Sequence, residues 1–258
     1  MFIQNASSVR TNTVRNSRRI VAFVLALAGV MVSLTALMVC APDGHASTNN
    51  LTRRLIGRSV QGRAIYAYER GDPYGPTVLV VGSIHGNEPA GMTVAKRLLR
   101  MPLREKIDLW VIPNLNPDGR AANRRQNAHG VDLNRNFPWH WRPLTGPYYS
   151  GRHSLSEPES RAAYHLIDQI QPVLSIWFHQ PLGVVDGSKR SPASERRFAR
   201  LSGLPLKQLQ GRFSGTATSW ERHTVPGATA FVAELHSGML SASAADRYAR
   251  AVLTVGAG

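Results

Sequence analysis

Residues 77–99 have the sequence TVLVVGSIHGNEPAGMTVAKRLL. The unbroken apolar run at 77–82 is typical of a strand that is buried on both faces of a sheet. Residues 88–99 then predict a helix, in which Pro89 is tolerated because it falls near the start. Because strands that alternate with helices are the hallmark of α/β proteins, this segment favours a sheet covered by helices.

The same alternation continues on both sides of this segment. Towards the N-terminus, residues 53–70 predict two strands around a turn at Gln61-Gly62. Towards the C-terminus we expect buried strands at 108–113, 173–178 and 230–235, a helix that a capping box at 156–159 opens and that runs to about Ile170, and a closing helix at 241–252. This order predicts a three-layer α/β/α sandwich with a mixed, largely buried central sheet.

The turn after the strand at 77–82 holds a histidine and a glutamate at a spacing suited to a metal ion. His85 and Glu88 flank the point where the strand gives way to the helix, so both side chains can face one cation. Zinc in hydrolases is commonly bound by two histidines and one glutamate, which leaves a position open for water. The pair alone is a weak signal, because this spacing occurs often by chance.

A dense group of polar residues follows the predicted strand at 108–113. It comprises NLNPDG at 114–119 and RQNAHGVDLNRNFP at 125–138, where interspersed apolar residues suggest a loop fixed to the core. Arg135 offers a planar fork that can bind a carboxylate at two points, and Asn134 can donate a further hydrogen bond. This pairing suits a substrate with a free terminal carboxylate.

Two further candidates lie at or near the ends of later strands. His179 comes directly after the apolar strand at 173–178, and Glu234 lies within the apolar segment 230–235. A carboxylate is costly to bury without a partner or a role, and burial raises its pKa towards the range of a general base. Reactive residues gather at strand ends in α/β sheets, which is where both of these residues and His85 are expected.

Taken in order along the chain, these motifs resemble the zinc carboxypeptidase family. The resemblance rests on HGNE at 85–88, NPDG at 116–119, the run at 125–138, the histidine after a strand and the glutamate within one, and it covers most of residues 51–258. The compact spacing and the SEPE segment at 156–159 are most similar to the small bacterial branch that contains murein peptide amidase A. Enzymes of that branch cut the bond between γ-D-glutamate and diaminopimelate in cell-wall peptides.

The resemblance implies a role for each candidate residue. Glu234 would be the general base, which takes a proton from water and passes it to the leaving amine. Arg125 would polarise the scissile carbonyl and stabilise the oxyanion, and Arg124 beside it is the alternative for that role. The free carboxylate beyond the scissile bond would be bound by Asn134 and Arg135. One zinc ion would be held by three ligands, namely His85, Glu88 and His179.

One position departs from the pattern of the family. The family often places a tyrosine roughly twenty residues before the catalytic glutamate, where it closes over the substrate. Phe213 takes that position here; it can pack on substrate but cannot donate a hydrogen bond. The departure bears on closure over the substrate and leaves the predicted zinc site intact.

The first 46 residues have the pattern of an export signal. A segment with four arginines and no acid is followed by an apolar run at 20–39 and a short polar stretch that ends at Ala46. We therefore expect residues 1–46 to be a cleaved signal peptide and residues 47–258 to be the peptidase domain, located in the periplasm, in the cell envelope or outside the cell. The alternative is an uncleaved membrane anchor, since about 20 apolar residues can span a bilayer.

The charge of the chain indicates its surroundings. The formal net charge is +15, and residues 47–258 keep +12 of it, because residues 1–46 hold four arginines and one aspartate. A basic exported domain favours anionic neighbours such as cell-wall polymer. We do not expect nucleic acid as a partner, because the chain has the pattern of an exported protein and no nucleic-acid-binding signature. Cys40 falls in the predicted signal, which leaves the domain without thiolate ligands.

Two other functions fit part of the pattern. Zinc deacylases of the aspartoacylase and succinylglutamate desuccinylase type also show HGNE and an LNR-containing motif. The NPDG motif, the spacing from Arg125 to Asn134 and the predicted export favour a peptidase instead. A non-catalytic wall-binding module with the same fold would have lost a metal ligand or the base, whereas all four positions are present here.

Overall fold

The computed structural model describes residues 51–103, 105–187, 190–209 and 214–258. The predicted signal at 1–46 and Phe213 therefore lie outside the described residues. Within the described ranges, no helix has both the length and the apolar character needed to cross a bilayer.

A mixed sheet runs through the described part of the chain. Its strands, in spatial order, are β1 (Thr52–Arg58), β2 (Ala64–Gly71), β4 (Asp108–Ile112), β3 (Thr77–Val81), β5 (Leu174–His179), β8 (Thr229–His236), β6 (Leu182–Asp186) and β7 (Leu206–Lys207). Neighbours among β4, β3, β5 and β8 are parallel, whereas β2 and β6 run antiparallel to β4 and β8. Strands β4 and β5 are buried along their whole length, as their continuous apolar sequences predict.

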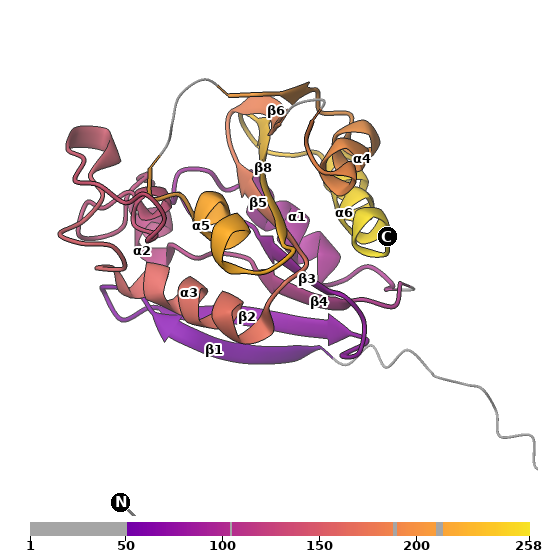
Figure 1. The fold of residues 1–258 in the computed structure, drawn as a ribbon, viewed down its shortest axis with the longest axis horizontal. Coiled ribbons are helices and arrows are strands. Elements are labelled where there is room, and N and C mark those ends of the chain that lie inside the picture. The colour runs from indigo at the N-terminus through magenta and orange to yellow at the C-terminus, as the bar shows by residue number, and fades with distance from the viewer. Residues whose placement is uncertain (1–50, 104, 188–189, 210–213) are drawn as a thin grey trace, which may run out of the picture. The chain divides into compact units, whose positions relative to one another are not determined.

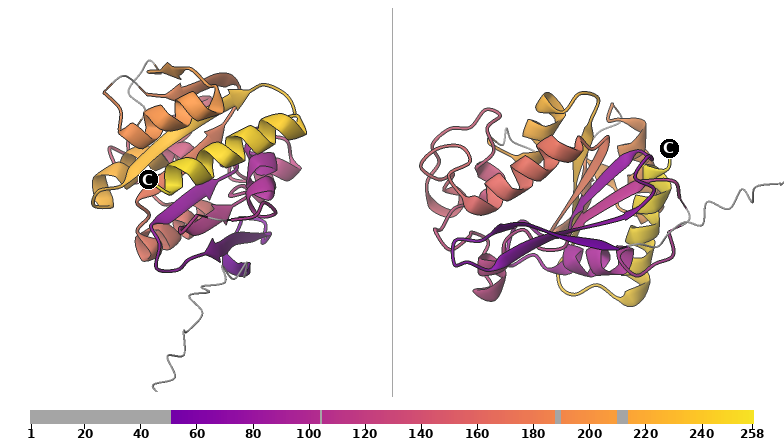
Figure 2. Two further views of the ribbon diagram at one scale, coloured as in Figure 1. Left: turned by 90° about the vertical axis from the view of Figure 1, so that its right-hand side faces the viewer. Right: turned by 90° about the horizontal axis from the view of Figure 1, so that it is seen from below.

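Helices cover both faces of the sheet. Helices α1 (Ala90–Leu98), α4 (Ala193–Ser202) and α6 (Ala242–Gly256) pack on one face (Figure 1), and Figure 2 shows α4 and α6 side by side there. Helices α3 (Pro158–Ile170) and α5 (Ala217–Thr224) pack on the other. Alternate residues of β3 point to the two cores, with Val78 and Val80 in one and Leu79 and Val81 in the other. The predicted three-layer α/β/α sandwich is confirmed.

The topology brings several chain segments to one edge of the sheet. The parallel strands β3, β5 and β8 end at this edge, and His179 of β5 lies beside Glu234 of β8 in the strand register. The connections after β3 and β4 also begin here. The first leads into α1, and the second contains α2 (Pro117–Ala121) and the 3₁₀ turns η1 (Leu133–Arg135) and η2 (Gly146–Tyr148). The candidate residues from the sequence therefore meet at the carboxyl ends of the strands, as expected for an α/β sheet.

Candidate active site

Three side chains converge at the ends of β3 and β5. His85 and Glu88 lie between β3 and α1, and His179 is the last residue of β5. The Nδ1 atom of His85 lies 3.0 Å from one carboxylate oxygen of Glu88, and the Nδ1 atom of His179 lies 3.1 Å from the other. All three residues are buried, and their candidate ligand atoms lie within 4.8 Å of one another.

The chemistry of this cluster fits a zinc ion. The Nε2 atom of His85 lies 3.0 Å from Asp132 Oδ1, so an ionised Asp132 fixes the proton on Nε2 and leaves a lone pair on Nδ1. That lone pair faces the Nδ1 atom of His179 at 3.1 Å and the carboxylate of Glu88. Two imidazole nitrogens and one carboxylate that converge in this way match the ligand set of catalytic zinc sites.

Two glycines allow the turn at His85 to approach α2. A Cβ atom on Gly86 would lie 1.9 Å from the backbone carbon of Gly119, a separation that no substituent could tolerate. Gly119 is itself held by Asn116, whose Oδ1 atom accepts from the Gly119 backbone N–H at 2.9 Å. The HGNE and NPDG motifs thus form one packed unit that positions His85.

Asp132 links the metal-ligand cluster to the polar loop. Besides its contact with His85, it accepts hydrogen bonds from Nε of Arg125 and from the backbone N–H of Asn134, each at 3.0 Å. Burial alone would raise the pKa of this carboxyl group, but His85 and Arg125 lower the pKa below its usual value. The sequence analysis did not single out Asp132, although it lies within the quoted VDLNR segment.

The structure distinguishes between the two arginine candidates. The guanidinium group of Arg125 donates to Glu88 at 3.1 Å and to Asp132 at 3.0 Å, which holds it against the metal-ligand cluster. Arg124 lines a different, smaller cavity beside Asp118. Of the two, Arg125 is therefore the residue whose side chain can reach a group bound at the cluster.

The predicted carboxylate-binding pair lies in η1. The amide oxygen of Asn134 accepts from the backbone N–H of Ala217 at 3.0 Å, which leaves the amide NH₂ group as a donor. Arg135 donates from NH1 to the backbone oxygen of Asn134 at 2.6 Å. Both side chains line the same cavity as His85 and His179.

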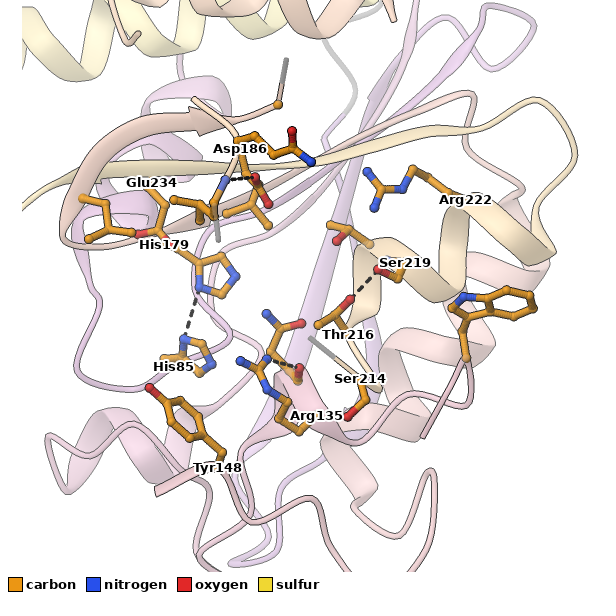
Figure 3. Close-up of a pocket in the computed structure, with 18 of the residues that line it drawn as sticks. His85, Arg135, Tyr148, His179, Asp186, Ser214, Thr216, Ser219, Arg222 and Glu234 are labelled. Carbon is orange, nitrogen blue, oxygen red and sulfur yellow. Dashed lines mark hydrogen bonds between the residues drawn. The ribbon is translucent and has the colours of Figure 1, made fainter. Parts of the chain in front are cut away.

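This cavity has a volume of about 950 Å³ (Figure 3). It is lined by most of the predicted site residues, namely His85, Arg125, Asn134, Arg135, His179 and Glu234. Glu88 is not part of the lining, and Phe213 cannot be placed because it lies outside the described residues. A cavity of this size can enclose a short peptide segment.

Tyr148 is a cavity residue that the sequence analysis missed. Its ring centroid lies 5.5 Å from Cζ of Arg125 and 5.3 Å from Cζ of Arg135, within the range of cation–π contacts. Figure 3 shows the side chain beside His85 and Arg135. Nothing in its local sequence marks Tyr148, because its position depends on the fold of the loop that contains η2.

Glu234 occupies the edge of the cavity next to His179. The residue is 9% exposed, and its Oε2 atom has no hydrogen-bond partner among the described residues. Burial raises the pKa of its carboxyl group above the usual value, although nearby His179 acts in the opposite direction. A buried carboxylate with an unused oxygen and a raised pKa can accept a proton from a bound molecule.

Comparison with known families assigns the chain. The sequence pattern that defines the zinc carboxypeptidases matches residues 44–220. The chain belongs to the zinc carboxypeptidase family. The predicted family is thus confirmed, and with it an enzyme of the hydrolase class. Glu234 lies beyond the matched segment, so its place beside the metal ligands rests on the pairing of β8 with β5.

Individual members of the zinc carboxypeptidase family resemble the chain to different extents. Murein peptide amidase A of Escherichia coli K12 is 31% identical over 64% of this chain and 74% of that protein. A carboxypeptidase of Arabidopsis thaliana is also 31% identical, but the match spans only 28% of its length. The crystal structure of a murein-tripeptide amidase from Escherichia coli O157 superposes with a TM-score of 0.66 and 26% identity, over 80% of this chain and 92% of that one.

Proposed function

We propose that this chain is an exported zinc peptidase that hydrolyses the amide bond before a residue with a free carboxylate, in cell-wall peptides such as γ-D-Glu–diaminopimelate. The observation that supports it is one cavity that adjoins a His–Glu–His cluster and is lined by a buried carboxylate and two arginines. The likeness to murein peptide amidases favours cell-wall peptides over protein C-termini.

In this proposal, His85, Glu88 and His179 hold one zinc ion. Zinc in such a site supplies a Lewis acid, which polarises a carbonyl oxygen and lowers the pKa of water to about 7. Asp132 orients His85 and strengthens it as a ligand, because the hydrogen bond to Nε2 directs the lone pair of Nδ1 to the cluster.

Glu234 acts as the general base. Its carboxyl group lines the cavity next to His179, where it can take the proton of the attacking water. As the amide bond breaks, the same carboxyl group returns that proton to the leaving amine. Such proton transfer contributes about 10²- to 10⁴-fold to the rate.

Arg125 stabilises the negative charge that develops on the scissile carbonyl oxygen. Glu88 and Asp132 hold its guanidinium group in place before substrate binds, so little reorganisation is needed during the reaction. Because Arg has five N–H donors, these contacts leave donors for the substrate.

Asn134 and Arg135 bind the free carboxylate beyond the scissile bond. Replacement of Arg135 by alanine should weaken cleavage of a free-acid peptide far more than cleavage of the same peptide with a C-terminal amide. Comparison of kcat/KM for the two peptides tests this, since only the acid can form a charge-assisted pair with the guanidinium group. Equal losses on both peptides would contradict the assigned role.

The proposed activity has a direct test. Residues 47–258 would be incubated with L-Ala-γ-D-Glu-diaminopimelate, and release of diaminopimelate followed by mass spectrometry. We expect cleavage that a chelator abolishes and added zinc restores, and that Glu234→Gln lowers by at least about 10²-fold. A zinc-loaded protein that leaves the peptide intact would reject this substrate, and protein C-termini and acylated amino acids would be tested next.

Export is supported by the sequence of residues 1–46. If this segment is a cleaved signal, the full chain expressed in a bacterial host should be recovered outside the cytoplasm with Ser47 as its first residue, which intact mass measurement can test. Recovery of the full-length chain in the membrane fraction would instead favour the uncleaved anchor.

A further inference from the structure

One end of the cavity carries charges that the proposed mechanism does not use. Asp186 ends β6, Glu195 lies in the first turn of α4 and Arg222 lies in α5, and all three line this end. Figure 3 shows Asp186 and Arg222 on the side of the cavity away from His85 and Tyr148. We call these three residues the distal charge cluster.

The side chains of Asp186 and Arg222 are held in place by backbone contacts. Asp186 accepts a hydrogen bond from the backbone N–H of Leu209 through Oδ1, at 2.9 Å. Arg222 donates from NH1 to the backbone oxygen of Ala230 at 3.3 Å. Each contact uses only part of the hydrogen-bonding capacity of the side chain, so both groups can still bind a ligand in the cavity.

Glu195 adds a buried carboxyl group to this end of the cavity. The residue is only 2% exposed and lines the cavity, yet its Oε1 atom has no hydrogen-bond partner among the described residues. A buried polar atom of this kind is uncommon, because the lost hydration is not replaced. Gly187 makes room for this carboxyl group, since a Cβ atom on Gly187 would lie only 1.7 Å from Oε1.

We propose that the distal charge cluster binds the zwitterionic end of a substrate side chain. The carboxylates of Asp186 and Glu195 would bind its ammonium group, and Arg222 would bind its carboxylate. This inference rests on the proposed function, in which Asn134 and Arg135 bind the α-carboxylate at another part of the same cavity. A residue with an amino-acid group at each end of an aliphatic chain, such as diaminopimelate, fits both places.

The distal charge cluster contains both positive and negative groups, which disfavours substrate side chains that carry only one charge. A lysine side chain would bring an ammonium group towards Asp186 and Glu195 but would offer no carboxylate to Arg222. An acidic side chain would pair with Arg222 but would be repelled by the carboxylates of Asp186 and Glu195. Only a side chain with both charges offers a group of opposite sign to all three residues of the cluster.

Three tripeptides that differ only at this end of the last residue test the inference. L-Ala-γ-D-Glu-meso-diaminopimelate carries both charged groups, the L-lysine peptide lacks the distal carboxylate, and the 2-aminopimelate peptide lacks the distal amine. We expect kcat/KM for the diaminopimelate peptide to exceed both others by about tenfold or more, the size expected for a charge-assisted hydrogen bond.

Two variants assign the discrimination to particular residues. Arg222→Gln should remove the preference for diaminopimelate over lysine, and Asp186→Asn should reduce the preference for diaminopimelate over 2-aminopimelate. Arg200→Gln removes the same charge from an exposed position on α4 and should leave both ratios unchanged. Because each ratio is measured on one preparation, partial misfolding of a variant cancels.

The outcomes separate this inference from the proposed function. Cleavage of all three peptides with similar kcat/KM, or variants that reduce all three equally, would overturn the distal charge cluster as a binding site while the peptidase activity stands. Failure to cleave any of the three by the zinc-loaded protein would reject the proposed substrate class itself.

Discussion

The aromatic ring of Tyr148 explains its position in the site. Its ring lies over the guanidinium groups of Arg125 and Arg135, which the proposed mechanism assigns to the oxyanion and to the substrate carboxylate. We expect Tyr148→Ala to lower kcat/KM for the tripeptide about two- to thirtyfold, because contacts of this kind contribute about 0.5–2 kcal/mol. Tyr148→Phe should stay close to the parent enzyme, since it keeps the ring.

The controls for this prediction separate the ring from the hydroxyl group. Tyr74 is 97% exposed, and Tyr74→Ala should leave kcat/KM unchanged. If Tyr148→Phe loses as much activity as Tyr148→Ala, the hydroxyl group is the important part and the role of the ring is contradicted.

Residues were predictable from the sequence where a motif or an unfavourable burial marked them. His85 and Glu88 stand in a compact motif, and Glu234 is a carboxylate in an apolar strand. Asp132 was missed because its importance comes from its contacts, above all with His85, which lies 47 residues away in the sequence. Tyr148 was missed for the same reason, since a tyrosine in a loop has no periodicity to mark it.

At the scale of elements, the contact between α5 and β5 depends on a buried carboxyl group. Glu221 of α5 accepts hydrogen bonds from Ser175 and Trp177 of β5, and burial raises its pKa to about 7. Between pH 4.5 and 7 the folded state keeps this proton and the unfolded state releases it. The group therefore stabilises the fold fully below pH 4.5, and this contribution is lost as pH rises through 7.

A variant can test this stability argument. Glu221→Gln mimics the protonated carboxyl group, so it should be more stable than the parent at pH 8, by up to about 3 kcal/mol, and nearly equal to it at pH 4.5. Urea unfolding at the two pH values measures the difference. Parallel pH dependence in the parent and the variant would show that Glu221 is not the responsible group.

The elements themselves were predictable to the extent that they bury apolar surface. The central strands gave continuous apolar runs, whereas α4 and α5 were missed because they are short and mostly polar on their exposed sides. The predicted capping box before α3 is wrong. The N-cap residue is Glu157, and its side chain makes no capping hydrogen bond. Glu159 instead accepts hydrogen bonds from the backbone N–H of Val60 and from the side chain of Asn127, so tertiary contacts replace the predicted capping bond.

At the scale of the whole molecule, the net charge makes a separate prediction about the cell wall. Residues 47–258 carry +12, so they should bind anionic wall polymer mainly through unspecific attraction. Screening shortens the reach of such attraction from about 10 Å at 0.1 M salt to about 3 Å at 1 M. Cleavage of the free tripeptide depends on short contacts inside the cavity and should change far less with salt.

Sedimentation with intact wall sacculi can measure the attraction to the polymer separately from catalysis. The Glu234→Gln variant would be used, so that the wall peptides are not consumed during the experiment. We expect the protein to sediment with sacculi that retain anionic polymer at low salt and to be released towards 1 M. Binding that persists at high salt would point to the peptide contacts of the cavity. No binding at low salt would contradict the prediction that the basic charge attracts anionic wall polymer.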